Sequence, residues 1–413
     1  MKTQELATDI VKHLVRHGYT AYFAGGWVRD YLMGHPSSDI DIATDAPPEV
    51  ILDLFPRTIL VGLQFGVVIV VWHGHQFEVS TFRRDIDYIK GRKPEKIELA
   101  DPKEDALRRD FTINGLFYDP LENEIHDFVD GAEDISKGVI RTIGDPFERF
   151  YEDRLRMIRA VRFAARFEFA IDLKTEEAIR ENAQDLFPPV SMERIWQEFC
   201  KMAAHSHFDR AIIDLHRLEL LPVIFPQLKG VSLTTIKQRV APFPLFPPET
   251  PTCLYLHELF VDQTEEELVD ILRYLKTSRQ DQKEIAFARH VRQTLFSSSP
   301  HMIEPHKWVA FYAHPLSSLL LAVETASIPP ERRESFLQFH LTQQQKWHAA
   351  IERKKERTPL VTSAHLITEG IKPGKLMGDL LDRAEEIAID EQLHTSRQVI
   401  QQLKESPLWP SPA

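Results

Sequence analysis

Two short segments decide the fold, AGGWVRD at residues 24–30 and SDIDIAT at residues 38–44. In the second segment Asp and Ile alternate, which predicts a half-buried strand over residues 39–43. Such a strand places the carboxylates of Asp39 and Asp41 on one face, where they are suited to divalent metal ions. The pair Gly25 and Gly26, directly before a helix start, is suited to phosphate. Together the two segments predict an enzyme that handles a nucleoside triphosphate.

The bulk properties are those of an ordinary globular protein. The 413 residues are 43% hydrophobic and 27% charged, and this length indicates about two to four structural units. No apolar run approaches the length of a membrane span, and residues 2–17 predict an amphipathic helix rather than a signal peptide. Cys200 and Cys253 lie in unrelated contexts, which excludes a disulfide framework or a cysteine-based zinc site and favours a cytoplasmic protein.

The charge of the chain is unevenly distributed. A net charge of −12 and a pI near 5.9 argue against a nucleic-acid binder on bulk charge alone. Phosphate contacts need only a local basic patch, however. Three such patches lie in a loop-like stretch at residues 83–96, on a helix at 149–166, and at 346–357 near the C-terminus. Each of them is also compatible with a solvated helix or loop face.

The pattern of elements changes along the chain. Strand patterns and short helices alternate in the first 130 residues or so, without a repeating βαβ order, and from residue 146 the chain reads as nearly all helical. This predicts an α+β fold with a mixed or antiparallel sheet, and His73-Gly74-His75 predicts a hairpin turn. The predicted strands lie at residues 20–24, 39–43, 58–61, 66–72 and 76–82, and the predicted early helices at 2–17, 27–33 and 47–55.

Further charged residues fit the chemistry of phosphoryl transfer. Such a transfer uses two metal ions, one for the attacking oxygen and one for the leaving pyrophosphate, and Mg²⁺ prefers carboxylate ligands. Glu78, in the strand pattern FEVSTFR at residues 77–83, is the best candidate for a third carboxylate. Arg29, in the first turn of its helix, could neutralise phosphate. Taken alone, Asp-x-Asp also fits a polar strand edge and Gly-Gly an ordinary turn.

A second polar cluster reads RRDFTING at residues 108–115. Arg108 and Arg109 offer anion-binding donors, while Asp110 and Asn114 offer groups that bind hydroxyls. The phosphates and sugar of a nucleotide need this combination. The same letters would also suit a charged helix start.

A third cluster lies on a helix predicted over residues 150–167. Glu152 and Arg156 are four residues apart, and Asp153 and Arg156 three apart, so each pair shares a helix face. A carboxylate beside a guanidinium presents an acceptor and fixed donors, which match the Watson–Crick edge of a base. An ordinary intrahelical salt bridge is the alternative interpretation.

These residues together carry a family resemblance. The chain resembles the class II tRNA nucleotidyltransferase and bacterial poly(A) polymerase family, within the polymerase-β-like nucleotidyltransferases. The matching stretches lie at residues 25–44, 78–83, 108–119, 127–131, 143–150 and 152–163, with a weaker match at 370–374 and 378–381. The resemblance implies an α+β fold with a catalytic nucleotidyltransferase head at 1–145, a nucleotide-selecting and RNA-binding helical neck at 146–230, and a helical body and tail at 231–413.

The resemblance also implies roles for single residues. Asp39 and Asp41 would be catalytic and would hold two Mg²⁺ ions, with Glu78 as the third metal ligand. Residues 145–150 would be a flexible joint, and the RNA 3′-hydroxyl would attack the α-phosphate and release pyrophosphate. The implied nucleotide-binding set is Gly25, Gly26, Arg29, Arg108, Arg109, Asp110, Asn114, Glu152, Asp153, Arg156 and Arg159.

Within the family, the preferred product is CCA on the 3′ end of tRNA, made from CTP and ATP. Residues 83–98 look like the flexible loop that CC-only members lack, and the acidic pI with the segment at 370–374 favours a tRNA enzyme over a poly(A) polymerase. An A-adding-only enzyme, a poly(A) polymerase and a non-catalytic RNA-binding relative stay as alternatives. Intact Asp39, Asp41 and Arg109 oppose the last of these. Binding of tRNA is expected at Lys354 and Lys355, no membrane partner is expected, and the oligomeric state stays open.

Overall fold

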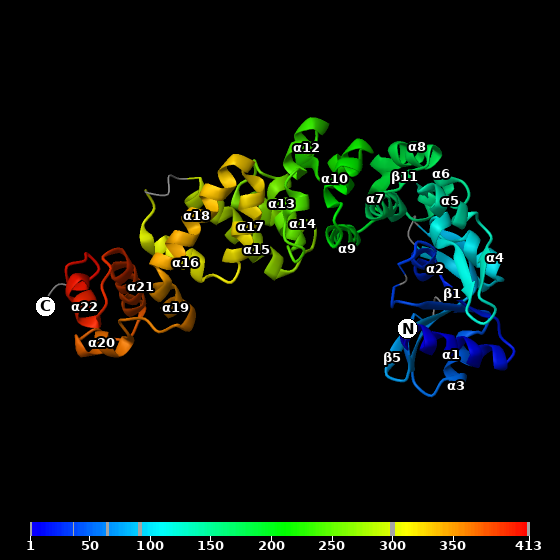
Figure 1. The fold of residues 1–413 in the computed structure, drawn as a ribbon, viewed down its shortest axis with the longest axis horizontal. Helices are drawn as coiled ribbons and strands as arrows, with labels where there is room; N and C mark the ends of the chain where they lie inside the picture. The colour runs from blue at the N-terminus through cyan, green and yellow to red at the C-terminus, as the bar shows by residue number, and fades with distance from the viewer. Residues whose placement is uncertain (1, 36, 63–65, 90–92, 298–301, 411–413) are drawn as a thin grey trace. The chain divides into compact units, whose positions relative to one another are not determined.

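The computed structural model describes residues 2–35, 37–62, 66–89, 93–297 and 302–410. The chain forms two compact units, Met1–Gln238 and Arg239–Ala413. Figure 1 shows a sheet with helices near the N-terminus, in blue and cyan, and mainly helices from α6 onward, where the short strand β11 also lies. The predicted fold class, α+β with a helical second half, is confirmed. The predicted boundaries at residues 145 and 230 stay a prediction.

The sheet of the first unit has seven strands in the order β3-β4-β5-β2-β1-β8-β9. Only β2 and β5 pair in parallel, and the other neighbours are antiparallel, so the predicted mixed sheet is confirmed. The strand predicted over residues 39–43 begins only at Asp41. The strands are β1 (Ala21–Ala24), β2 (Asp41–Thr44), β3 (Thr58–Gly62), β4 (Val67–Trp72), β5 (His75–Thr81), β8 (Leu116–Asp119) and β9 (Glu124–Asp127).

The two faces of this sheet are covered differently. Apolar residues at helical spacing on α1, among them Ile10 and Leu14, pack with Ile42 and Val79 in the larger core. Ala43, which points the opposite way along β2, belongs to a small cluster with Phe82 and Ala106. The helices around the sheet are α1 (Lys2–Arg16), α2 (Gly26–Leu32), α3 (Pro48–Leu54), α4 (Pro102–Leu107) and α5 (Gly131–Lys137).

The stretch predicted as loop-like at residues 83–96 lies in a two-stranded antiparallel hairpin instead. Strands β6 (Arg83–Ile89) and β7 (Lys93–Leu99) pair with Arg83 opposite Leu99, and residues 90–92 lie outside the described residues. The prediction was wrong because the dense charge of this segment concealed its alternating pattern, DIDYI at residues 85–89.

Helices complete the first unit, and one of them departs from the prediction. The single helix expected over residues 150–167 is two helices, because α6 ends at Glu152 and α7 begins at Leu155. Asp153 between them is extended, and its side chain accepts a hydrogen bond from the Leu155 amide at 3.0 Å. A carboxylate that binds backbone in this way favours a helix boundary over a helix interior. The helices are α6 (Pro146–Glu152), α7 (Leu155–Phe167), α8 (Leu173–Asn182), α9 (Met192–Ala203), α10 (Phe208–Arg217), α11 (Leu220–Ile224) and α12 (Leu233–Val240), with a short parallel pair of β10 (Val139–Ile140) and β11 (Ala170–Ile171). The last two residues of α12 belong to the second unit.

The described part of the second unit is helical. Thr264 and Ser278 begin α14 and α15 with capping boxes, and the last three helices share a core of their own. Among the described residues no single helix is long and apolar enough to cross a membrane, although the bent pair α16 and α17 passes that test of length and composition together. The helices are α13 (Thr252–Leu259), α14 (Glu265–Tyr274), α15 (Arg279–Val291), α16 (Pro305–Ala313), α17 (Ser317–Ser327), α18 (Pro330–Lys346), α19 (His348–Glu356), α20 (Ser363–Thr368), α21 (Lys375–Asp390) and α22 (Ser396–Lys404).

Candidate functional site

Three carboxylates lie together at one end of the paired strands β2 and β5. Ile42 lies opposite Val79 in the register, so Asp41 and Glu78, one residue earlier on each strand, project from the same side of the sheet. Ile40 and Ile42 are buried, whereas Asp39, Asp41 and Glu78 are exposed. The alternation predicted from the sequence therefore places all three acidic side chains away from the core.

The carboxylate of Asp41 is the most perturbed of the three. Its pKa is raised to about 6, first by burial of the carboxylate among protein atoms and then by the negative charges of Glu78 and Asp39. Arg109 opposes this rise. A divalent cation would relieve this repulsion, so the donor set fits a metal ion of the Mg²⁺ class.

The three groups are not drawn tightly together. Among the described residues, two sets of three possible metal ligands have all their ligand atoms within 4.8 Å of one another, and both sets lie in the second unit. Asp39, Asp41 and Glu78 do not meet this distance criterion. Repulsion between like charges favours this wider spacing.

The turn between β1 and α2 brings Gly25 against Arg109. Gly25 has φ +65°, a conformation that side chains rarely adopt, and a Cβ there would lie 2.9 Å from Arg109 Nη1. Arg109 donates from the same nitrogen to the backbone oxygen of Asn114 at 3.3 Å. Gly25 and Arg109 are thus close neighbours, a Cβ on Gly26 would lie 3.6 Å from Arg29 Nη2, and the positive charge of Arg109 acts on Asp41.

Asp105 holds both arginines of the second cluster, and sequence reasoning missed it. Its carboxylate is buried, accepts from Arg109 Nε and Nη2 at 3.1 and 3.0 Å, and lies 2.7 Å from Arg108 Nη2. Burial alone would raise the pKa of Asp105, but Arg109 and Arg108 lower it. The spacing of three and four residues on a helix is the signal that could have revealed this anchor.

Asp110 joins the sheet-bearing part of the unit to α7. Its Oδ2 accepts from Arg159 Nε and Nη2 at 2.8 and 2.5 Å, and its Oδ1 accepts from Asn114 Nδ2 at 3.0 Å. Burial would raise the pKa of Asp110, but Arg159 and Asn114 lower it to about 2. The carboxylate is therefore ionised and largely occupied by these partners.

Arg29 lies in the interior rather than open to solvent. It is 4% exposed, donates to Asn114 Oδ1 at 2.6 Å and to Asp30 Oδ1 at 2.8 Å, and lies 4.5 Å from the centre of the Phe167 ring. Burial lowers the pKa of its guanidinium, and Asp30 opposes this. Arg29 thus links α2 to α7, and its contact with phosphate stays a prediction.

The third cluster divides at the break between α6 and α7. Arg156 donates to Glu152, as the spacing predicts, and to the backbone oxygens of Arg149 and Arg108 at 3.0 and 3.3 Å. Asp153 pairs instead with Arg194 of α9, a residue that sequence reasoning did not select. No local pattern connects positions 153 and 194, because only the packing of α9 brings them together.

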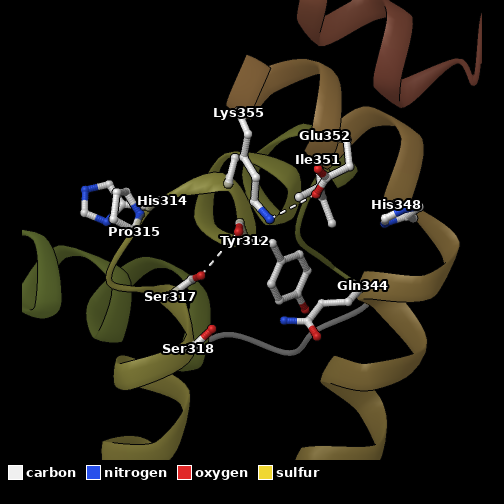
Figure 2. A pocket seen from close by; sticks show the side chains of 11 residues that line it. Tyr312, His314, Pro315, Ser317, Ser318, Gln344, His348, Ile351, Glu352 and Lys355 are labelled. Carbon is white, nitrogen blue, oxygen red and sulfur yellow. Dashed lines mark hydrogen bonds and ion pairs between the residues drawn. The ribbon is translucent and has the colours of Figure 1, made fainter. Parts of the chain in front are cut away.

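The second unit contains a pocket of about 700 Å³ among α16, α17, α18 and α19. Lys355, one of the residues expected to bind tRNA, lines it, and Figure 2 shows its ammonium group directed to Glu352, at 3.0 Å. Lys354 and Lys355 are both exposed on α19.

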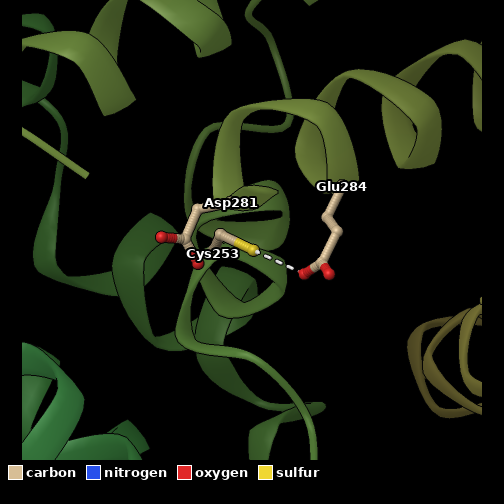
Figure 3. A group of neighbouring side chains, drawn as sticks. All are labelled: Cys253, Asp281 and Glu284. Carbon is tan, nitrogen blue, oxygen red and sulfur yellow. Dashed lines mark hydrogen bonds between the residues drawn. The ribbon is translucent and has the colours of Figure 1, made fainter. Parts of the chain in front are cut away.

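The two potential metal-ligand sets of the second unit already have other partners. Figure 3 shows the hydrogen bond that Cys253 Sγ donates to Glu284, at 3.8 Å. Burial raises the pKa of the Cys253 thiol. The side chain of Asp281 takes part in the capping box at the start of α15. The other set is His257, Glu258 and Glu324. There the guanidinium of Arg292 already binds both carboxylates. Neither set calls for a metal ion.

Comparisons with known proteins give a consistent result. Residues 21–141 match the family described as "Poly A polymerase head domain", and residues 168–231 match "Probable RNA and SrmB- binding site of polymerase A". The chain is 33% identical to a CCA-adding enzyme of Pediococcus pentosaceus over 94% of each chain, and 32% identical to that of Bacillus licheniformis over 97% of each. It superposes on the Bacillus stearothermophilus CCA-adding enzyme solved with CTP with a TM-score of 0.78, at 28% identity over 98% of each chain. The Thermotoga maritima CCA-adding enzyme solved with tRNA shares the fold, with a TM-score of 0.70 at 19% identity over 98% of this chain and 95% of that one.

Proposed function

The chain belongs to the class II tRNA nucleotidyltransferase and bacterial poly(A) polymerase family, as the sequence predicts, and on this premise we propose that it adds CCA to the 3′ end of tRNA. The family is a family of metal-dependent nucleotidyltransferases. The full-length relatives are named CCA-adding enzymes, which favours CCA over a single A or a poly(A) tail. CTP, ATP and tRNA are the proposed substrates, and two free cysteines are in keeping with a cytoplasmic enzyme.

The acidic cluster is the observation that best supports the proposed chemistry. Asp39 and Asp41 would hold two Mg²⁺ ions, and Glu78, registered beside Asp41, would be the third ligand. Bound there, Mg²⁺ would lower the pKa of the RNA 3′-hydroxyl and neutralise charge on the leaving pyrophosphate. The 3′ oxygen would form its bond to the α-phosphorus as the bond to pyrophosphate breaks.

The remaining residues would position the nucleotide. The backbone of Gly25 and Gly26 would bind the triphosphate together with Arg109, which lies against Gly25 and which Asp105 holds in place. Arg108 would add positive charge. Arg29, buried between Asp30 and Asn114, would help to neutralise the charge of the phosphates. Asp110, held by Arg159, would orient Asn114 toward the ribose. Glu152, Asp153 and Arg156 would present the polar edge that selects the base.

Product sequencing tests the proposed function. The protein is incubated with tRNA ending at the discriminator base, at CC and at CCA, and with an unrelated RNA, together with CTP and ATP. CCA on the first substrate and A on the second are the expected products. Long A tails on the unrelated RNA would indicate a poly(A) polymerase, addition only to tRNA ending in CC would indicate an A-adding enzyme, and no product at all would indicate a non-catalytic relative.

The raised pKa of Asp41 predicts a pH dependence of metal binding. Because a metal ion binds the carboxylate and competes with the proton, affinity for Mn²⁺ is expected to fall by up to about tenfold per pH unit below pH 6. The folding stability of the metal-free protein is expected to change with pH in the opposite direction. A carboxyl pKa raised by folding contributes stability at low pH, and this stability is lost as the pH rises through about 6. Calorimetric titration with Mn²⁺ between pH 5 and 8 measures the first effect, and an affinity independent of pH would contradict it.

The exposed lysines of α19 predict a salt-dependent contact with RNA. Replacing Lys354 and Lys355 with Ala is expected to weaken tRNA binding and to lower the slope of log affinity against log salt by about 1 to 2. Filter binding across a series of KCl concentrations measures both quantities. The variant Arg273→Ala with Lys276→Ala removes the same charge from exposed positions near α14 and serves as the control. Equal affinity and slope for the Lys354 and Lys355 variant and the wild type would reject the α19 site.

A further inference from the structure

The carboxylate of Asp153 is held by two hydrogen bonds from one arginine. Arg194 Nη1 donates to Oδ1 at 3.1 Å and Nη2 donates to Oδ2 at 2.7 Å, a bidentate pair. Oδ1 also accepts from the Leu155 amide at 3.0 Å. Both side chains are largely covered, with 24% of Arg194 and 19% of Asp153 exposed. The direction of this carboxylate is therefore fixed, and Oδ2 keeps capacity for one more donor.

The position of Arg194 is not explained by the helix that carries it. Arg194 is the third residue of α9, which follows the N-cap Ser191. The N-terminus of a helix disfavours a positive charge, and the side chain of Ser191 forms no capping hydrogen bond. The positive charge of Arg194 is balanced by the carboxylate of Asp153, 41 residues earlier in the chain.

The bases differ in the hydrogen-bonding groups that they would present to the carboxylate of Asp153. Cytosine N4 and adenine N6 are amino groups that donate, whereas uracil and guanine carry acceptor oxygens at the corresponding positions. An ionised carboxylate only accepts, so a carboxylate fixed in direction favours CTP and ATP over UTP and GTP. Resting on the proposed function, we propose that Arg194 is a positioning residue that sets base selection by fixing Asp153.

Two variants of Arg194 separate this role from simple packing. Arg194→Lys keeps the charge but loses the bidentate fork, and Arg194→Met keeps the length of the side chain without the charge. Arg217, which pairs with Glu176 and Asp214 in the same unit, provides the control Arg217→Met. The ratio of kcat/KM for CTP over UTP is measured on tRNA ending at the discriminator base, and that for ATP over GTP on tRNA ending in CC. Thermal unfolding of every variant is followed in parallel.

The expected result is a change in selectivity rather than in rate alone. Both ratios should fall by about tenfold in Arg194→Met, fall less in Arg194→Lys, and stay at the wild-type value in Arg217→Met. Ratios within twofold of the wild type in both Arg194 variants, whatever their overall rate, would overturn the proposal, as would an equal fall in Arg217→Met. If Arg194→Met does not fold, Arg194→Lys decides. A wild-type protein that adds neither C nor A to tRNA would overturn the proposed function itself.

Discussion

Replacing Asp41 with Asn is expected to lower kcat for nucleotide transfer by about 10³-fold or more, because it removes the charge that binds the catalytic metal. An amide keeps the shape of the side chain but cannot balance the charge of a divalent cation. Incorporation of labelled CMP and AMP into tRNA, at saturating nucleotide and Mg²⁺, measures the loss. Retention of more than about a tenth of the wild-type kcat would contradict the role of Asp41 as a metal ligand.

The same substitution is expected to leave the fold intact. Burial and the charges of Glu78 and Asp39 disfavour the ionised form of Asp41, so a neutral side chain relieves repulsion, and the metal-free variant should unfold at the same temperature as the wild type or higher. Loss of activity with gain of stability is typical of residues kept for chemistry. Asp45→Asn is the matched control. Asp45 accepts from the Thr20 amide at 2.7 Å, and the Asn oxygen can replace that acceptor, so activity should persist.

Local patterns in the sequence were sufficient for the acidic cluster and for most of the sheet. The alternation around Asp39 and Asp41 has the period of a strand, and burial of the intervening Ile40 follows directly from it. Glu78 follows from the same rule on β5. The parallel pairing that brings Glu78 beside Asp41 joins strands far apart in sequence, and the strand patterns alone did not predict it.

Partners that meet through tertiary packing could not be read in the same way. The sequence predicted that Arg29 neutralises phosphate from the first turn of its helix, but Phe163 and Phe167 of α7 lie against its guanidinium. The pair of Asp153 and Arg194 depends on how α9 packs, and the break at Asp153 depends on a side chain that competes for a backbone amide. The spacing of residues along the sequence predicts contacts within one helix. Contacts between different helices can be identified only once the tertiary fold is known.

Replacing Glu198 with Ala is expected to destabilise the first unit by about 3–5 kcal/mol, because it leaves Arg162 charged and buried without a partner. Arg162 Nε donates to Glu198 Oε2 at 2.6 Å, and the two side chains are only 7% and 2% exposed. Burial would raise the pKa of Glu198, but Arg162, Arg159 and Lys201 lower it. The pair therefore contributes stability above the unfolded pKa of Glu that is lost as the pH falls through the lowered value.

Two further variants separate the buried pair from the exposed charge beside it. Lys201, which is 54% exposed and 3.1 Å from Glu198, should cost less than about 1 kcal/mol when replaced with Ala. Replacing Arg162 and Glu198 together with Met should recover much of the loss, because apolar side chains of similar volume need no partner. Urea unfolding at pH 7 measures all three. If Glu198→Ala unfolds at the same urea concentration as Lys201→Ala, the guanidinium of Arg162 is solvated in the variant. The buried pair then does not stabilise the contact between α7 and α9. A double variant less stable than Glu198→Ala would instead show that the geometry of the pair, rather than the cost of an isolated charge, stabilises this contact.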